Sequence, residues 1–443
     1  MARKPLRAVG RLAPLVVMFF CAVLSAHLRA QQPATSSGET IRVARLVTEL
    51  GADSFAVRKR ATDELAKIGP EARQAIEEAT RSEDPEVRLR AKDLLREIKI
   101  RDLWSASRFI APPGEARPAA DILKLLGEQT GNHVMFDAPY GALTNAPVKL
   151  DVTPAEYWPA LDEICRQSAN HPRHHYDTRA VGMAVVSGAP GRHPLAYAGP
   201  VRGRITSARR AFIEEMSYEE ARSETSHTFQ LNVEMTWEDR FKLVAYRASP
   251  EVLAATTDTG VTLNAAQPAA GGWNVTGVGS RQALMNIRLQ PPPARARELE
   301  TLRLAWELIA VGDFTHLDVE DLASREPRFQ DDVELVIESF QPTTGGRYEV
   351  VVRMRRNLTA PDPAEAILQE HDLELIDAAG TSLRKLNQSG ALADHGATIK
   401  ATFLAANETS PPQKLRFTYP RLRSQRNLEI IFRHVPLPTG LPE

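Results

Sequence analysis

Residues 122–133 read ILKLLGEQTGNH and residues 160–171 read ALDEICRQSANH, so one short pattern occurs twice in the middle of the chain. In each copy, apolar residues recur at helical spacing, which predicts a helix with one apolar face. A Gly-Asn-His turn ends the first copy at His133, and an Ala-Asn-His turn ends the second at His171. The two copies therefore predict two similar helices, each followed by a turn and an extended segment.

Short apolar or alternating segments flank these helices and predict strands. The expected order is strand, helix, strand, strand, helix, strand (βαββαβ), which describes a small α+β module with one mixed sheet and both helices on one face. The strands are expected at residues 107–110, 134–136, 148–152 and 181–187, and the helices at residues 118–129 and 155–168. The module as a whole is assigned to residues 103–190.

This order, the EQTGN stretch at residues 128–132 and the VKLDVTPA stretch at residues 148–155 resemble the short N-terminal (STN) domain of secretins and TonB-dependent receptors. The resemblance covers residues 105–188. It implies a periplasmic interaction domain that contacts partner proteins and has no catalytic residues. No sequence of an outer-membrane barrel or secretin core follows, so the resemblance does not extend to a channel or receptor role.

Residues 41–102 show helical spacing with breaks at Gly51 and at Gly69-Pro70, and Ser82 or Asp84 is expected to cap the last helix. The FAVRKRATDEL stretch at residues 55–65 and the DPEVRLRA stretch at residues 84–91 resemble HEAT-like repeats of the phycobilisome-lyase type, over residues 53–98. That resemblance implies an all-α domain. Its helix pairs either bind another protein or stabilise the domain that follows.

Residues 1–30 have the layout of a secretory signal peptide. Basic residues precede an apolar run over residues 12–24, and Ala26 and Ala30 allow cleavage. We therefore expect an exported protein, periplasmic or at the cell surface, with residues 31–40 as a flexible lead-in. The alternative is an uncleaved signal that remains as an N-terminal membrane anchor.

Charge and cysteine content exclude other classes of protein. The 443 residues include 55 Lys plus Arg and 56 Asp plus Glu, for a formal net charge of -1. This balance gives no overall field that would attract nucleic acid, so we expect no nucleic-acid partner. The cysteines are Cys21, within the signal, and Cys165, so we expect no disulfide and place Cys165 in a core.

From residue 223 onward, apolar and polar residues alternate in many short runs, which predicts antiparallel sheets with one buried face. We assign two β-sandwich domains, at residues 223–325 and 326–443, preceded by a linker over residues 191–222. Segments 257–263 (TDTGVTL) and 376–383 (IDAAGTSL) each predict a tight hairpin turn. Near the C-terminus two paired strands are expected, and their apolar residues are Leu415, Phe417, Tyr419, then Leu428, Ile430 and Phe432.

The candidate metal ligands gather in one region and include His171, His174, His175 and, further on, His193. Zinc needs three or four converging ligands, and strand alternation places His174 and His175 on opposite faces. The pair Asp331-Asp332 is acidic, but calcium needs six or more oxygen ligands. We therefore expect neither a metal nor another cofactor.

The expected linker contains a run of opposite charges. Its arginines are Arg202, Arg204, Arg209 and Arg210, and the glutamates that follow are Glu214, Glu215, Glu219 and Glu220. A nucleic-acid platform interleaves basic with aromatic residues, and this run lacks that interleaving. We interpret the run as a solvated linker.

No G-x-S-x-G elbow, phosphate-binding G-x-x-x-x-G-K-[ST] loop or H-E-x-x-H helix occurs. We predict an exported, non-enzymatic interaction or scaffolding protein of the bacterial cell envelope that binds other proteins, and we assign no catalytic residues. The alternative is an extracytoplasmic hydrolase or carbohydrate-binding protein with a site on a sandwich face, lined by carboxylates or by Trp237, Trp273 and Trp306. A free strand edge or an exposed apolar patch would favour a docking site.

Overall fold

The computed structural model describes residues 37–136, 144–151, 154–176, 181–188, 191–217, 219, 222–266, 271–276, 280–356, 371–393, 396–405 and 411–438. The protein is β-rich and multi-domain, with several antiparallel sheets, and it divides into two compact units, Met1–Ile98 and Lys99–Glu443. The expected signal peptide and Cys21 lie outside the described residues. Within the described ranges, every helix is too short or too polar to cross a membrane.

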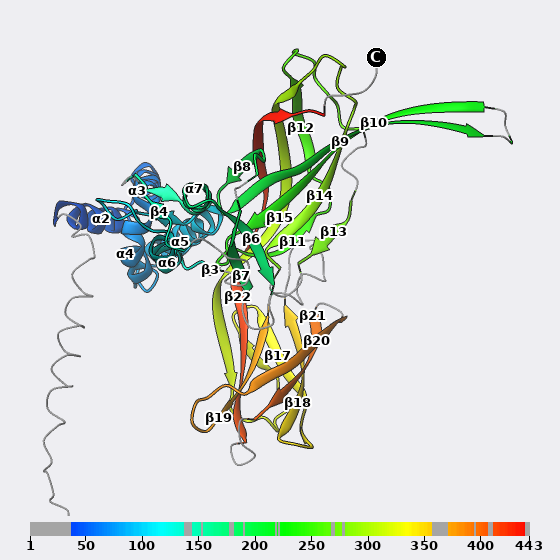
Figure 1. The fold of residues 1–443 in the computed structure, drawn as a ribbon. Helices are drawn as coiled ribbons and strands as arrows, with labels where there is room; N and C mark the ends of the chain where they lie inside the picture. Colours follow the sequence, from blue (N-terminus) through cyan, green and yellow to red (C-terminus); the bar gives the residue numbers. More distant parts are fainter. Residues whose placement is uncertain are drawn as a thin grey trace, which may run out of the picture. The chain divides into compact units, whose positions relative to one another are not determined.

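The described elements of the first unit are helices (Figure 1). They are α2 (Ser37–Glu49), α3 (Phe55–Ile68), η1 (Gly69–Ala72), α4 (Arg73–Ala79) and α5 (Pro85–Trp104), the last of which continues into the second unit. As expected, Asp84 caps α5: its Oδ1 accepts hydrogen bonds from the backbone N–H groups of Glu86 at 2.8 Å and Val87 at 3.3 Å. The flexible lead-in expected through residue 40 is wrong at its end, because α2 already begins at Ser37.

The apolar stripes of these helices meet in a core of their own. Leu46, Leu65, Ile76 and Leu94 are each at most 1% exposed. Each comes from a different helix, so the helices are held together by burial of these side chains.

The mid-chain segment forms the α+β part of the second unit, and both repeated stretches are helical as expected. Its elements are β1 (Arg108–Phe109), β2 (Arg117–Pro118), α6 (Ala119–Thr130), β3 (Val134–Phe136), β4 (Pro147–Val148), β5 (Ala155–Glu156), α7 (Tyr157–Gln167), β6 (Asn170–Tyr176) and β7 (Val181–Ser187). β7 pairs with β3 in parallel and with β6 antiparallel. The expected single mixed sheet is wrong, because β1–β5 and β2–β4 form separate two-stranded ladders.

A glutamine at the end of each repeated helix bonds the backbone next to one of these short ladders. The backbone N–H of Ile110 donates to Oε1 of Gln129 at 2.9 Å, and that of Lys149 donates to Oε1 of Gln167 at 2.9 Å. The amide Nε2 of each glutamine donates back to the carbonyl of the same residue. Ile110 and Lys149 thus pair with a side chain where a strand would otherwise pair with them.

The turn after each repeated helix also has the same backbone conformation. Gly131 has φ +68° and Ala169, its counterpart in the second copy, has φ +50°. This left-handed region costs glycine little and costs alanine about 1 kcal/mol or more. The turn geometry is therefore kept even where the second copy lacks the glycine.

Among the residues that the structure describes, the rest of the second unit forms three antiparallel sheets (Figure 1). The first contains β8 (Leu195–Ala198), β9 (Val201–Ser217), β10 (Arg222–Trp237) and β14 (Gln282–Leu289). The central one contains β11 (Lys242–Arg247), β12 (Glu251–Thr257), β13 (Trp273–Val275), β15 (Glu298–Val319), β19 (Asp372–Asp377) and β22 (Pro412–Pro436). The third contains β16 (Arg328–Gln330), β17 (Val333–Thr343), β18 (Arg347–Arg356), β20 (Arg384–Ala393) and β21 (Gly396–Leu404).

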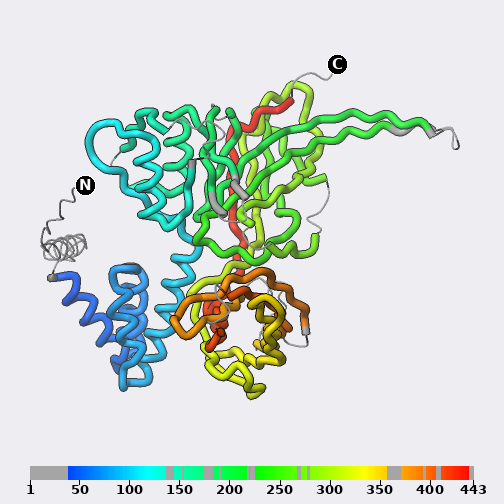
Figure 2. The backbone as a smooth tube through the Cα atoms, turned by 60° about the horizontal axis from the view of Figure 1, so that its bottom comes forward, coloured from blue at the N-terminus to red at the C-terminus, as the bar shows by residue number. Residues whose placement is uncertain are grey.

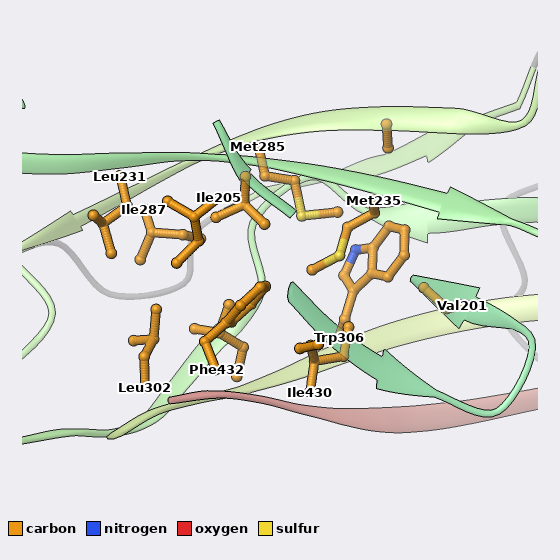
Figure 3. Close-up of a cluster of buried hydrophobic side chains, with 14 of the residues drawn as sticks. Val201, Ile205, Leu231, Met235, Met285, Ile287, Leu302, Trp306, Ile430 and Phe432 are labelled. Carbon is orange, nitrogen blue, oxygen red and sulfur yellow. The ribbon is translucent and has the colours of Figure 1, made fainter. Parts of the chain in front are cut away.

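β15 and β22 are long enough to serve two hydrophobic cores. They pair from Glu298 opposite Pro436 to Val319 opposite Leu415. One end of the pair packs against the β8–β9–β10–β14 sheet, and the other packs against the sheet that contains β17 and β18. Figure 3 shows part of the first core, where Phe432 of β22 and Trp306 of β15 face Ile205 and Met235.

This sharing of strands corrects two expectations. The boundary between residues 325 and 326 is wrong, because the C-terminal half of β22 returns to the first core. The two strands expected near the C-terminus are one continuous strand, since Pro420 and Leu422 keep pairing with β15 between the two cores.

The expected linker over residues 191–222 is also wrong. Most of it forms β8 and β9, and β9 pairs with β10 over its whole length. The two predicted hairpin turns are confirmed: Gly260 donates to the carbonyl of Thr257 at 2.9 Å, and Gly380 donates to that of Asp377 at 3.0 Å. Both glycines have positive φ, as a tight turn requires.

Candidate functional site

The histidines considered as metal ligands have different surroundings. His171 is half-buried on β6 and its Nδ1 lies 3.4 Å from the carbonyl oxygen of Gly188. His174 and His175 belong to the same strand, but their side chains lie outside the described part of the structure. Among the side chains that are described, no three His, Cys, Asp or Glu residues converge on a common point suited to a metal ion.

The carboxylates of Asp331 and Asp332 accept hydrogen bonds from other side chains. Tyr419 donates to Oδ2 of Asp331 at 3.0 Å, and Arg356 Nε donates to Oδ2 of Asp332 at 2.8 Å. The two carboxylates thus face different partners.

The three tryptophans of the alternative hypothesis do not line one exposed face. Trp237 and Trp306 are 1% and 0% exposed and belong to the first β core. Trp273 is half-buried, and the guanidinium of Arg247 lies 4.6 Å from its ring centroid. Cys165 is fully buried as expected, and burial raises the pKa of its thiol.

A cavity of about 680 Å³ lies where the α+β part meets β8 and β9. Its wall includes Asp162, Glu163 and Arg166 of α7, Tyr197 of β8, and Arg202 and Arg204 of β9. Arg202 and Arg204, which the sequence placed in a linker, therefore line a cavity near the start of β9.

A buried ion pair organises that cavity. Nε and Nη2 of Arg202 donate to the two carboxylate oxygens of Asp162 at 2.7 and 2.8 Å, and the Tyr197 hydroxyl donates to the same carboxylate at 2.8 Å. Burial, and then the charge of Asp162, raise the pKa of Tyr197. Arg166 hydrogen-bonds Glu163 and lowers the pKa of that carboxyl. Asp162 and Glu163 are thus each paired with a guanidinium group through charge-assisted hydrogen bonds.

A second polar network fixes the turn after the first repeated helix. The side chain of Glu238 is 0% exposed and accepts hydrogen bonds from Ser107 N–H at 2.9 Å, Asn132 Nδ2 at 3.2 Å and Arg240 Nε at 2.9 Å. Asn132 Oδ1 also accepts from the backbone N–H of Asp239 at 2.8 Å. The Gly-Asn-His turn therefore joins the α+β part to the strands that follow.

Residues 211–217 of β9 and 222–228 of β10 form a two-stranded arm that extends beyond the end of β14. Figures 1 and 2 both show the two strands running on together away from the sheets. β14 pairs with β10 only as far as Phe229, and β8 pairs with β9 only as far as Arg204. Beyond Phe229, the described strands of the arm pair only with each other.

The arm carries apolar side chains into solvent. Phe212, Ile213 and Met216 are 51%, 51% and 55% exposed. Phe212 lies on one face of the sheet, and closer to the core the same face carries the buried Phe229 and Leu231. The ring of Phe212 packs on that of His227, with the ring centroids 4.7 Å apart. The core face of the sheet thus continues along the arm, where the described part of the chain has no second sheet to cover it.

No protein-family model matches the chain, and no curated protein matches it. Its function must therefore be inferred from the chemistry and geometry of its own residues.

Proposed function

We propose that this chain is an exported, non-enzymatic interaction or scaffolding protein of the bacterial cell envelope that binds other proteins. The signal-like residues 1–30 and the resemblance of residues 105–188 to the STN domain support export to the periplasm or cell surface. The resemblance of residues 53–98 to HEAT-like repeats supports a second set of helices suited to protein contacts. In this proposal the paired sheets after residue 191 are β-sandwiches, and the arm extends from one of them.

The observation that carries the proposal is the exposed arm. A two-stranded ribbon without a third strand or a covering layer is marginally stable in water. Exposed Phe212, Ile213 and Met216 add an apolar surface that is unfavourable in solvent. Both costs are removed when another protein covers the arm, so the arm is best explained as a protein-binding element.

Site-specific photo-cross-linking tests this function. A photoreactive amino acid replaces Phe212 on the arm or, as the matched control, Leu284 on β14, which is 71% exposed but lies away from the arm. In cells that export the protein, we expect protein adducts at position 212 and few or none at position 284. Absence of protein adducts at position 212, or equal labelling at both positions, would overturn the proposed function.

A further inference from the structure

The outer edge of β9 is available for pairing. β8 leaves this edge after Arg204, and the last backbone hydrogen bond on it runs from Ile205 N–H to the carbonyl of Pro194 at 3.0 Å. From Thr206 to Ser217, none of the described strands pairs with that side of β9. A free edge of this length is a template for another strand.

The charges and polarities along this edge are arranged symmetrically about Phe212. Residues 207–217 read SARRAFIEEMS, with Phe212 at the centre. Positions at equal distance on either side of Phe212 carry opposite charges or matching polarity. These positions are Arg210 and Glu214, Arg209 and Glu215, Ala211 and Ile213, Ala208 and Met216, and Ser207 and Ser217.

Such a sequence is complementary to itself when two copies run antiparallel. In a two-fold arrangement, residue i of one copy lies opposite residue j of the other, and j lies opposite i. With Phe212 on the axis, Arg210 faces Glu214 and Arg209 faces Glu215 of the second copy, twice each. Cross-strand pairs of opposite charge contribute roughly 0.2–1 kcal/mol each, whereas like charges directly opposite are destabilising. A parallel pairing in the same register would instead place arginine against arginine.

We propose that two copies of this chain associate through their arms, with the outer edges of β9 paired antiparallel and Phe212 on the two-fold axis. The result is a continuous four-stranded sheet in the order β10, β9, β9, β10. The inference rests on the proposed function, because it identifies the protein that the arm contacts as a second copy of the same chain.

The surroundings of Arg210 agree with this arrangement. Arg210 Nε is shielded from solvent and has no hydrogen-bond partner among the described residues. In the dimer, the carboxylate of Glu214 of the second copy lies opposite this guanidinium. The length of the free edge also matches the pairing. β8 leaves this edge of β9 after Arg204, and the proposed pairing begins at Ser207, which lies opposite Ser217 of the second copy.

Charge exchange between copies tests the register. In R209E/R210E all four cross-strand charge pairs become Glu against Glu, and in E214R/E215R all four become Arg against Arg. We expect analytical ultracentrifugation to show a wild-type dimer, and each double variant to weaken it by more than about tenfold in dissociation constant. An equimolar mixture of the two double variants pairs Glu with Arg at all four positions and should restore a heterodimer.

The variant R209E/R210E/E214R/E215R is the matched control, because it is again complementary to itself and should dimerise like the wild type. Leu284→Glu should leave the dimer unchanged. Circular dichroism melts establish that each variant is folded. A monomeric wild type, a dimer that survives both double exchanges, or a mixture that stays monomeric would each overturn the inference. Adducts at position 212 with other proteins, combined with a monomeric wild type, would leave the proposed function standing and remove only the second copy as partner.

Discussion

Gln129 and Gln167 make the same two hydrogen bonds at equivalent positions of the repeated sequence. Each accepts a backbone N–H at 2.9 Å through Oε1, from Ile110 and Lys149 respectively, and each donates to the carbonyl of that same residue, at 3.1 Å and 2.9 Å. The glutamine therefore substitutes for a strand partner in both halves of the α+β part. The repetition in the sequence corresponds to a repeated backbone contact as well as to a repeated helix.

Replacement of either glutamine should destabilise the second unit by a similar amount. Gln129→Ala and Gln167→Ala each remove two hydrogen bonds to extended backbone, and we expect a loss of roughly 1–2 kcal/mol from each. The midpoint of chemical denaturation measures this loss. Gln74→Ala is the control, since Gln74 lies on the surface of α4 and its amide donates to Glu78 at 3.3 Å on the exposed side of the helix. A smaller effect at position 129 or 167 than at position 74 would contradict the assignment.

Replacement of the turn residue Asn132 should lower the free energy of unfolding more than replacement of an exposed asparagine. Asn132 is 4% exposed and joins Glu238 to the backbone of Asp239, so Asn132→Ala leaves the buried Glu238 carboxylate with one donor fewer. We expect a loss of about 1–3 kcal/mol in unfolding free energy. Asn286→Ala, which removes a solvent-exposed bond to Asn232, should change it by about 0.5 kcal/mol or less. Equal effects would show that the network does not stabilise the unit.

Loss of the ion pair between Arg202 and Asp162 should destabilise the protein more than loss of an exposed ion pair. The side chains are 5% and 13% exposed, so Asp162→Asn leaves a buried guanidinium without its counter-charge, at a cost of roughly 3–5 kcal/mol. The control is Glu429→Gln, since Glu429 and its partner Arg303 are 43% and 45% exposed and such pairs contribute about 0–1 kcal/mol. Thermal melts followed by circular dichroism compare the two variants. If Asp162→Asn melts at the wild-type temperature, the pair does not hold the α+β part on β9.

Short periodic elements could be predicted from the sequence, because their signal is local. The apolar faces of the two repeated helices are buried, and the alternating Phe229, Leu231 and Val233 form one buried face of β10. The bonds of Gln129 and Gln167 could not be predicted, since a surface glutamine on a helix gives no local sign of the backbone it will meet.

Long-range features were missed for physical reasons as well. The apolar alternation stops near Pro420, which predicts a strand end there. The strand instead passes from one core to the next, and its pairing with β15 continues. Both faces of the arm are exposed, so its sequence lacks the pattern of one buried face and predicts a linker instead of a strand. The signal that could have revealed it is Phe212-Ile213 placed between two arginines and two glutamates.

Stability should depend on pH through Asp318 at the end of β15. Arg416 and Lys414 donate to its carboxylate at 2.9–3.0 Å, and the hydrogen bond from Arg416 is the largest cause that holds the pKa of Asp318 well below its usual range. A lowered pKa in the folded state stabilises the fold above the unfolded pKa of about 3.9, and this stabilisation is lost as the pH falls further. Asp318→Asn should therefore melt below the wild type near neutral pH, with a difference that shrinks in acid below about pH 4. A difference that stays constant across this range would contradict the assignment.

Phe212 in the arm and Phe229 at the base of the arm lie on the same face, and their replacement should affect the free energy of unfolding differently. Phe229 is 1% exposed within the first core, so Phe229→Ala should cost about 3–5 kcal/mol in unfolding free energy. Phe212 is 51% exposed on the same face of the neighbouring strand, and Phe212→Ala should cost no more than about 1 kcal/mol when the protein is dilute enough to be monomeric. At higher concentration the Phe212 variant should lose the additional stability that association gives to the wild type. Melting temperatures measured over a dilution series separate the two effects, and a Phe212 variant as unstable as the Phe229 variant at high dilution would show that the arm is packed within its own chain.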